Sequence, residues 1–213
     1  MENRKHTSLK DLAQALGVSI PTVSRALKDS PEISRELCAK AKALAKEMNY
    51  RPNPFAMSLR KNAPRIIGVI VPDIVTHFFA SILNGIENMA IANGYFVIIT
   101  TSHESYEHEK RNIENLVNMR VEGIIACLSQ ETTDFSHISA LKDINMPLIL
   151  FDRVCLTDQF SSVVADGVQS AQMATQHLLN NGSKRVAFIG GANHLDIVKR
   201  RKHGYLEALR DNR

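Results

Sequence analysis

The chain has 213 residues, of which 26 are lysine or arginine and 22 are aspartate or glutamate, so its formal net charge at pH 7 is +4. Its three cysteines are scattered and odd in number, which argues against a disulfide framework and favours reduced thiols in the cytoplasm. No apolar run approaches the length of a membrane span, and the N-terminus lacks the apolar segment of an export signal. We therefore expect no membrane partner.

The positive charge is confined to the beginning of the chain. Residues 1–62 hold 12 basic and 6 acidic side chains, a net of +6, whereas the remainder holds 14 and 16, a net of −2. A basic excess concentrated in one domain is typical of a surface that faces nucleic-acid phosphates. The charge pattern predicts a DNA-binding domain whose affinity falls as salt is added.

Residues 9–27 predict two short helices joined by a tight corner. Gly17 would supply the positive φ of the corner, Ser19 is a good N-cap for the second helix, and Pro21 is tolerated in its first turn. Apolar residues recur at the spacing of one buried helix face, at Leu9, Leu12, Ala13, Leu16, Val23, Ala26 and Leu27. This is the pattern of a helix-turn-helix.

The second helix of this pair leaves a mixed face for solvent or DNA. The face consists of Ile20, Pro21, Thr22, Ser24, Arg25 and Lys28. An arginine on a helix that enters the major groove can pair with guanine through two hydrogen bonds. The alternative is an ordinary two-helix corner with a solvated arginine.

Residues 7–49 resemble the DNA-binding headpiece of the LacI family. The family motif D-[VL]-A-x-x-x-G-V-S-x-x-T-V-S-R is present from Asp11 to Arg25, and a third helix is predicted from Ser34 to Met48. Residues 54–60 then align with the hinge helix of that family, so residues 1–62 form the expected DNA-binding domain. The resemblance implies DNA contacts from Leu9, Ser19, Ile20, Pro21, Thr22, Ser24, Arg25, Lys28, Asn53, Ala56 and Leu59.

The resemblance gives Leu59 a special role, as the apolar wedge that unstacks the central base step in the minor groove. A plain packing role for this leucine is the alternative. The chain also departs from the family pattern, because Ile20 and Pro21 have no side-chain hydrogen bonds to offer. Leu37 and Cys38 stand where the family has a phosphate-binding Thr-Arg pair, so we expect Lys28 and Arg35 to contact phosphate instead.

Residues 63–213 alternate between apolar strands and amphipathic helices, which predicts an α/β doubly wound parallel-sheet core behind the all-α headpiece. The predicted strands span residues 65–71, 95–101, 123–128, 148–152, 162–166 and 185–190. The predicted helices span residues 78–93, 107–119, 135–145, 168–181 and 197–210. This part resembles the type I periplasmic-binding-protein-like core of the same family.

In such sheets ligands bind beyond the carboxyl ends of the strands. The candidates at these places, including an arginine assigned by the resemblance, are Asp73, Phe78, Phe79, Ser129, Asp152, Arg153, Asp166 and Arg201. Two alternatives stay open, since Phe78 or Phe79 could be plain core and Asp166 could simply cap the helix that follows it.

A two-lobed ligand domain needs about 100 to 150 residues in each lobe. Residues 63–161 would form the first lobe and residues 162–213 only the start of the second. We therefore expect a truncated chain with weak or absent effector binding.

The sequence, with the resemblance, predicts a transcriptional repressor that binds a pseudo-palindromic double-stranded DNA operator as a homodimer and responds to a sugar-like small-molecule effector. The alternative is a solute-binding protein of the periplasmic type, which needs an export signal and no basic headpiece. An enzyme is not expected, because no Ser-His or Cys-His pairing is visible at the strand ends. No spacing fits a metal site or a nucleotide fingerprint, so no metal or cofactor is predicted.

Overall fold

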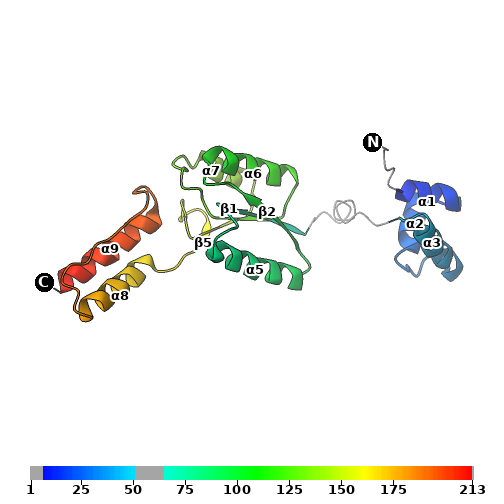
Figure 1. Ribbon diagram of the computed structural model, residues 1–213. Helices are drawn as coiled ribbons and strands as arrows, with labels where there is room; N and C mark the ends of the chain where they lie inside the picture. Colours follow the sequence, from blue (N-terminus) through cyan, green and yellow to red (C-terminus); the bar gives the residue numbers. More distant parts are fainter. Residues whose placement is uncertain (1–6, 51–64, 213) are drawn as a thin grey trace. The chain divides into compact units, whose positions relative to one another are not determined.

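The computed structural model describes residues 7–50 and 65–212, and the chain divides into two compact units, Met1–Asn62 and Ala63–Arg213 (Figure 1). The first unit is the basic headpiece and the second is the α/β core. Among the described residues, no helix is long and apolar enough to cross a membrane.

The headpiece consists of three helices, α1 (Leu9–Leu16), α2 (Ile20–Ala26) and α3 (Arg35–Glu47). Each begins at a serine whose hydroxyl accepts a hydrogen bond from a backbone N–H of the first turn: Ser8, Ser19 and Ser34. Gly17 ends α1 with φ +66°, a conformation in which a side chain would be strained. The predicted corner and the predicted caps at Ser19 and Ser34 are confirmed.

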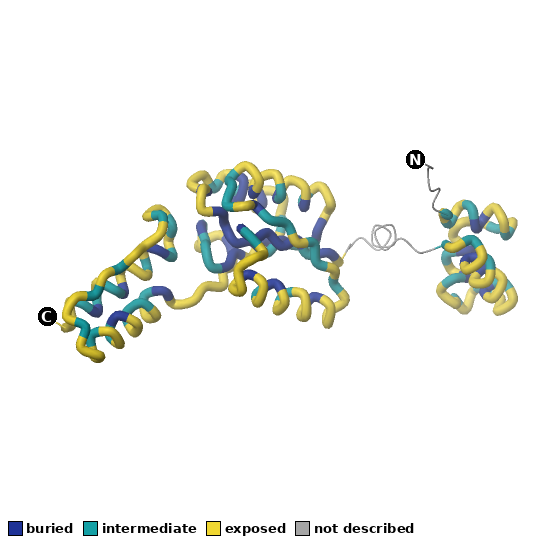
Figure 2. Tube along the Cα trace, viewed as in Figure 1, coloured by how far each residue is buried: buried dark blue, intermediate teal, exposed yellow. Residues whose placement is uncertain are grey.

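A small apolar core holds the three helices of the headpiece together. Leu12 of α1, Val23 and Ala26 of α2, and Ala41 of α3 are completely buried. Figure 2 shows the buried residues on the inner sides of these helices, with the outer sides exposed. The outer face of α2 is therefore available to a partner.

The second unit is built on a parallel sheet of five strands in the order β2-β1-β3-β4-β5. The strands are β1 (Ile66–Val71), β2 (Phe96–Thr101), β3 (Gly123–Ala126), β4 (Leu148–Phe151) and β5 (Ser161–Val163). Because β1 pairs with both β2 and β3, the order reverses at β1. A reversal of this kind opens a crevice at the carboxyl ends of the strands.

Helices cover both faces of this sheet. Helix α5 (His77–Ala92) lies on one face, and α6 (Tyr106–Asn118) and α7 (Ser136–Asp143) lie on the other (Figure 1). Two separate apolar clusters result, one around Phe79 and Leu83 of α5 and one around Leu116 of α6 and Ile138 of α7. Gly68 allows close packing here, since a Cβ at this position would lie 2.6 Å from a methyl carbon of Leu116.

The end of the chain forms a helical hairpin of α8 (Gly167–Asn180) and α9 (Asp196–Asp211), which pack on each other (Figure 1). Their contact is close at Gly204, where a Cβ would overlap the carbonyl oxygen of Val168. Only glycine can occupy this crossing without moving the helices apart.

The structure corrects two predictions about strands. Residues 185–190 form no strand, because the described residues provide no neighbouring strand to complete its hydrogen bonds. Instead the hydroxyl of Tyr205 donates to the carbonyl oxygen of Val186 at 2.8 Å, and Phe188 stacks on the Tyr205 ring. The strand predicted at residues 162–166 is the shorter β5 (Ser161–Val163), which pairs with β4 as the edge strand of the five-stranded sheet.

Candidate functional site

The outward face of α2 presents apolar and basic side chains to solvent. Ile20, Pro21 and Arg25 are exposed on this helix, as is Lys28 in the turn that follows it, whereas Thr22 and Ser24 are half-buried. The hydroxyls of Ser19 and Thr22 lie 2.8 Å apart and hydrogen-bond to each other at the start of the helix. Fewer of the predicted residues are therefore fully exposed, and Arg25 and Lys28 supply the positive charge of this surface.

Arg25 forms an ion pair within the headpiece. Its Nη1 lies 3.0 Å from Oε2 of Glu32, and both side chains remain more than half exposed. Glu32 belongs to the segment that connects α2 to α3, and nothing in its spacing from Arg25 pointed to this contact.

The remaining residues at and beside the predicted DNA interface fall into three groups. Leu9 is half-buried and packs against the headpiece core, while Arg35 is exposed at the start of α3. Leu37 is half-buried and Cys38 is buried, so their side chains help to close the core. Asn53, Ala56, Leu59 and the predicted hinge helix at residues 54–60 lie outside the described residues, and their roles stay predictions.

In the second unit, one cavity of about 440 Å³ brings together five of the eight predicted ligand-binding residues: Phe78, Phe79, Asp152, Arg153 and Arg201. They come from α5, from the segment after β4 and from α9. The remaining lining residues are Thr76, Gln130, Gly191, Ala192, Leu195, Ile197 and Val198. A second cavity, of about 510 Å³, shares Arg153 and Leu195 with the first.

The two aromatic residues of the cavity are not equivalent. Phe78 is half exposed, whereas Phe79 is almost completely buried and packs edge-on against Phe151 in the core. The rings of Phe78 and Phe79 lie edge to face, with centroids 5.2 Å apart. Phe79 therefore supports the wall from behind, and Phe78 offers the free aromatic surface.

Asp73 and Asp166 do not line this cavity. The Asp73 carboxylate accepts hydrogen bonds from the backbone N–H groups of Val75 and Thr76, just before α5. Asp166 caps α8 by accepting from the N–H groups of Val168 and Gln169. The two carboxylates thus stabilise the turns that lead into the helices, which is the alternative left open for Asp166.

Arg153 is held tightly by Glu104, which follows β2. Its two terminal nitrogens lie 2.5 and 2.9 Å from the two carboxylate oxygens, and Nη1 also donates to the carbonyl oxygen of Leu128 at 3.2 Å. The same carboxylate accepts from the backbone N–H of Gln130 at 2.7 Å. Glu104 therefore joins three loops at the carboxyl edge of the sheet and fixes Arg153 in the cavity wall.

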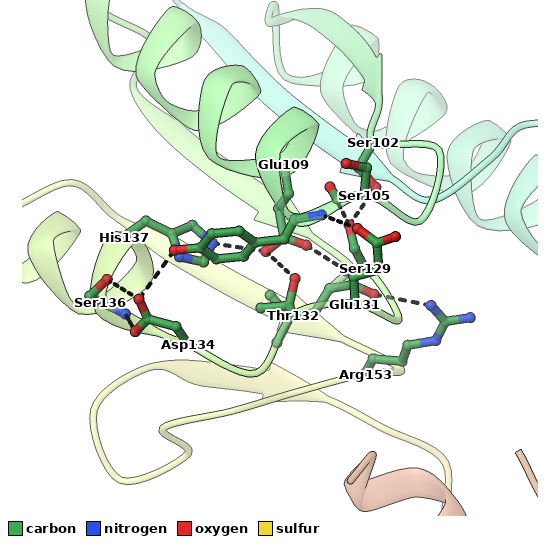
Figure 3. Close-up of polar contacts among 12 residues, drawn as sticks. Ser102, Ser105, Glu109, Ser129, Glu131, Thr132, Asp134, Ser136, His137 and Arg153 are labelled. Carbon is green, nitrogen blue, oxygen red and sulfur yellow. Dashed lines mark hydrogen bonds and ion pairs between the residues drawn. The ribbon is translucent and has the colours of Figure 1, made fainter. Parts of the chain in front are cut away.

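A buried polar network lies next to this site (Figure 3). The carboxylate of Glu109 on α6 accepts from the backbone N–H of Ser129 at 2.5 Å and from the hydroxyl of Thr132 at 2.9 Å. The Ser129 hydroxyl donates to Ser102 at 2.7 Å. Ser129 is completely buried and absent from the cavity lining, so its predicted place in the pocket is wrong.

Burial raises the pKa of the Asp152 carboxyl above its usual value, and the neighbouring Arg153 and Arg201 guanidinium groups partly offset this effect. A half-buried carboxylate beside arginines can accept hydrogen bonds from ligand hydroxyls, and Arg201 can donate to ligand oxygens. Among residues 7–50 and 65–212, no three histidine, cysteine, aspartate or glutamate side chains group as possible metal ligands.

Two family models match the chain, one for each unit. Residues 65–212 match the model described as periplasmic binding proteins and sugar binding domain of the LacI family. Residues 8–53 match the model of bacterial regulatory proteins of the lacI family. The chain belongs to the LacI family.

Known LacI-family proteins resemble this chain over nearly its whole length. It is 32% identical over 203 residues to the ribose operon repressor of Bacillus subtilis and 31% identical over 212 residues to catabolite control protein A of Priestia megaterium. These matches cover 95% and 97% of this chain and 60% and 62% of the relatives. The chain therefore spans about 60% of the length of these LacI-family relatives.

The fold of this LacI-family chain also matches a crystal structure of the lac repressor dimer bound to operator and the anti-inducer ONPF. The TM-score is 0.78 at 26% identity, and the match covers 98% of this chain and 63% of the repressor chain. The sequence left a solute-binding protein of the periplasmic type as the alternative, because such proteins share the core. The match of residues 8–53 to the regulatory-protein model favours a regulator over that alternative.

Proposed function

We propose that this chain represses transcription in the cytoplasm by binding a pseudo-palindromic DNA operator as a homodimer, under the control of a sugar-like effector. The observation that carries the proposal is the exposed face of α2 with Arg25, extended by Lys28 in the turn after the helix, in a headpiece of net charge +6. Such a face suits the major groove, where arginine recognises guanine and the remaining basic side chains meet phosphate.

The cavity of the second unit supports the effector part of the proposal. Phe78 offers an aromatic surface, and Asp152 and Arg201 offer an acceptor and a donor at its wall. Sugars present both C–H faces and hydroxyls, so an aromatic surface with a few polar groups suits them. The related repressor of Bacillus subtilis is named for a ribose operon, which agrees with this class of effector.

The DNA part is tested by selecting bound duplexes from a random-sequence pool with the chain and its Arg25→Ala variant. We expect the chain to enrich a palindromic site and the variant to lose preference at one base pair of each half-site. Lys46→Ala is the matched control, because it removes one exposed positive charge near the end of α3. Equal sequence preference in all three proteins would contradict the proposal.

A further inference from the structure

We propose that Glu32 is a positioning residue that orients Arg25 for base recognition. The inference rests on the proposed DNA-binding function and adds a residue outside the helix-turn-helix motif. Its basis is the 3.0 Å contact between Nη1 of Arg25 and Oε2 of Glu32 on the exposed side of the headpiece.

The backbone around Glu32 is fixed relative to Arg25. The N–H of Ser30 donates to the carbonyl oxygen of Arg25 at 3.1 Å, and the N–H of Ile33 donates to the carbonyl oxygen of Ser30 at 3.0 Å. The side chain of Ile33 packs into the apolar cluster between α2 and α3. The Glu32 carboxylate is thus presented to Arg25 by an ordered turn.

A second ion pair anchors the same turn to α3. The Nζ of Lys42 lies 2.6 Å from both carboxylate oxygens of Asp29, which has φ +53°. The two acidic residues of this turn therefore have separate tasks. Asp29 ties the turn to α3, and Glu32 holds the arginine of α2.

A carboxylate can bind an arginine without occupying all of its hydrogen-bond donors. The guanidinium group has five N–H donors in one plane, and Glu32 contacts a single terminal nitrogen. Holding that nitrogen restricts the rotamers of a long side chain and leaves other donors free for a guanine edge. Arg25 would then lose less conformational freedom on binding, which favours the matching base over others.

A second glutamate of the headpiece, Glu36, serves as a control for the loss of negative charge in Glu32→Gln. Glu36 pairs with Lys40 along α3 at 2.8 Å, and both side chains are exposed to a similar extent as Arg25 and Glu32. Glu36→Gln therefore removes the same charge from the same domain without altering the Arg25 contact. Any effect shared by Glu32→Gln and Glu36→Gln comes from net charge.

The experiment measures discrimination, the ratio of affinities for two duplexes. One is the duplex most enriched by the unsubstituted chain, and the other differs at the base pair for which Arg25→Ala loses preference. The proteins are the 213-residue chain and its Glu32→Gln, Glu32→Ala, Glu36→Gln and Arg25→Ala variants, with the Arg25→Ala/Glu32→Ala double variant. Titrations at two salt concentrations separate phosphate contacts from base recognition.

We expect Glu32→Ala to reduce discrimination by about three- to fivefold, the upper part of the range of an exposed ion pair, and Glu32→Gln to reduce it less. Glu36→Gln should leave discrimination unchanged, and the double variant should lose no more than Arg25→Ala alone. A purely structural role would instead weaken binding to both duplexes equally.

The inference alone is overturned if Arg25→Ala loses discrimination while both Glu32 variants behave like Glu36→Gln. It is also overturned if the Glu32 variants lose preference at a different base pair, since Glu32 would then contact a base itself. If the selection shows that Arg25→Ala loses preference at no base pair, the assignment of Arg25 as the base-reading residue fails, and the inference fails with it.

Discussion

The Nε2 atom of His137 lies 2.8 Å from Oε1 of Glu109, and both side chains are almost completely shielded from water. The Tyr106 ring meets the His137 ring edge-on at 5.1 Å, and Thr132 and the Ser129 backbone donate to the same carboxylate. Glu109 thus accepts hydrogen bonds from three groups that come from different parts of the chain. It fixes the end of the sheet beside the cavity.

The first prediction concerns this carboxylate. Glu109→Gln should lower the free energy of unfolding by about 1 to 3 kcal/mol, because the amide group opposes donors that the carboxylate satisfied. Urea unfolding followed by circular dichroism measures the change. Glu107→Gln, an exposed position on the same helix, should change stability by less than about 0.5 kcal/mol. Equal effects of the two variants would show that the network contributes nothing.

The second prediction is a pH dependence at Asp152. Burial raises the pKa of its carboxyl in the folded chain, so the folded state keeps the proton to higher pH than the unfolded state. The contribution of this group to stability therefore falls as pH rises from the ordinary carboxyl pKa through the raised one. Asp152→Asn removes the penalty, and asparagine tolerates the positive φ of +58° found here.

Melting temperatures of both proteins between about pH 3 and pH 7 test this prediction. The variant should be more stable than the parent chain near pH 7, and the difference should shrink towards acid. A difference that is independent of pH would mean that the Asp152 carboxyl titrates alike in the folded and unfolded states.

The third prediction compares two helical glycines. Gly204→Ala should destabilise the α8–α9 hairpin by about 1 to 3 kcal/mol, because the added methyl group overlaps the Val168 carbonyl oxygen. Gly85→Ala in α5 meets nothing within 4 Å and should stabilise by about 0.5 to 1 kcal/mol. Denaturant unfolding of both variants decides the matter, and a stabilising Gly204→Ala would show that the helices can separate at little cost.

The fourth prediction concerns thiol reactivity. Burial raises the pKa of Cys127 and of Cys155 to about 12, so about one thiol in ten thousand is ionised at pH 8. Cys38 is also buried. A disulfide reagent at pH 8 should label the native chain slowly and all three thiols rapidly in urea. Fast labelling of Cys127 or Cys155 in the native chain would contradict the packing around them.

The headpiece could be predicted from the sequence because its determinants are local. The apolar spacing in α1, the caps at Ser19 and Ser34, and the corner at Gly17 each depend on residues a few positions apart. The strands of the second unit were predictable for a related reason, since apolar runs bounded by helices indicate a parallel sheet.

The cavity could be predicted only in part. The rule that ligands bind at strand ends placed Phe78, Asp152 and Arg153, and the family resemblance added Arg201. The partner of Arg153 was missed, because Glu104 lies 49 residues earlier in the chain and only the folded sheet brings them together. The strand predicted at residues 185–190 was wrong for a similar reason, because a strand needs a neighbouring strand that its own residues do not specify. Calorimetric titration with a panel of sugars tests whether the cavity binds an effector.

The charges around the cavity balance in pairs. Arg153 forms an ion pair with Glu104, and the charge of Arg201 partly offsets the effect of burial, which raises the pKa of the nearby Asp152 carboxyl. The formal charges of the lining residues Asp152, Arg153 and Arg201, together with Glu104, therefore sum to zero. An uncharged polyol could settle there without leaving an isolated charge in a half-buried place. A phosphorylated compound would bring a surplus of negative charge to this lining. The salt link behind the wall therefore lowers the net positive charge of the lining, through a residue that does not itself line the cavity.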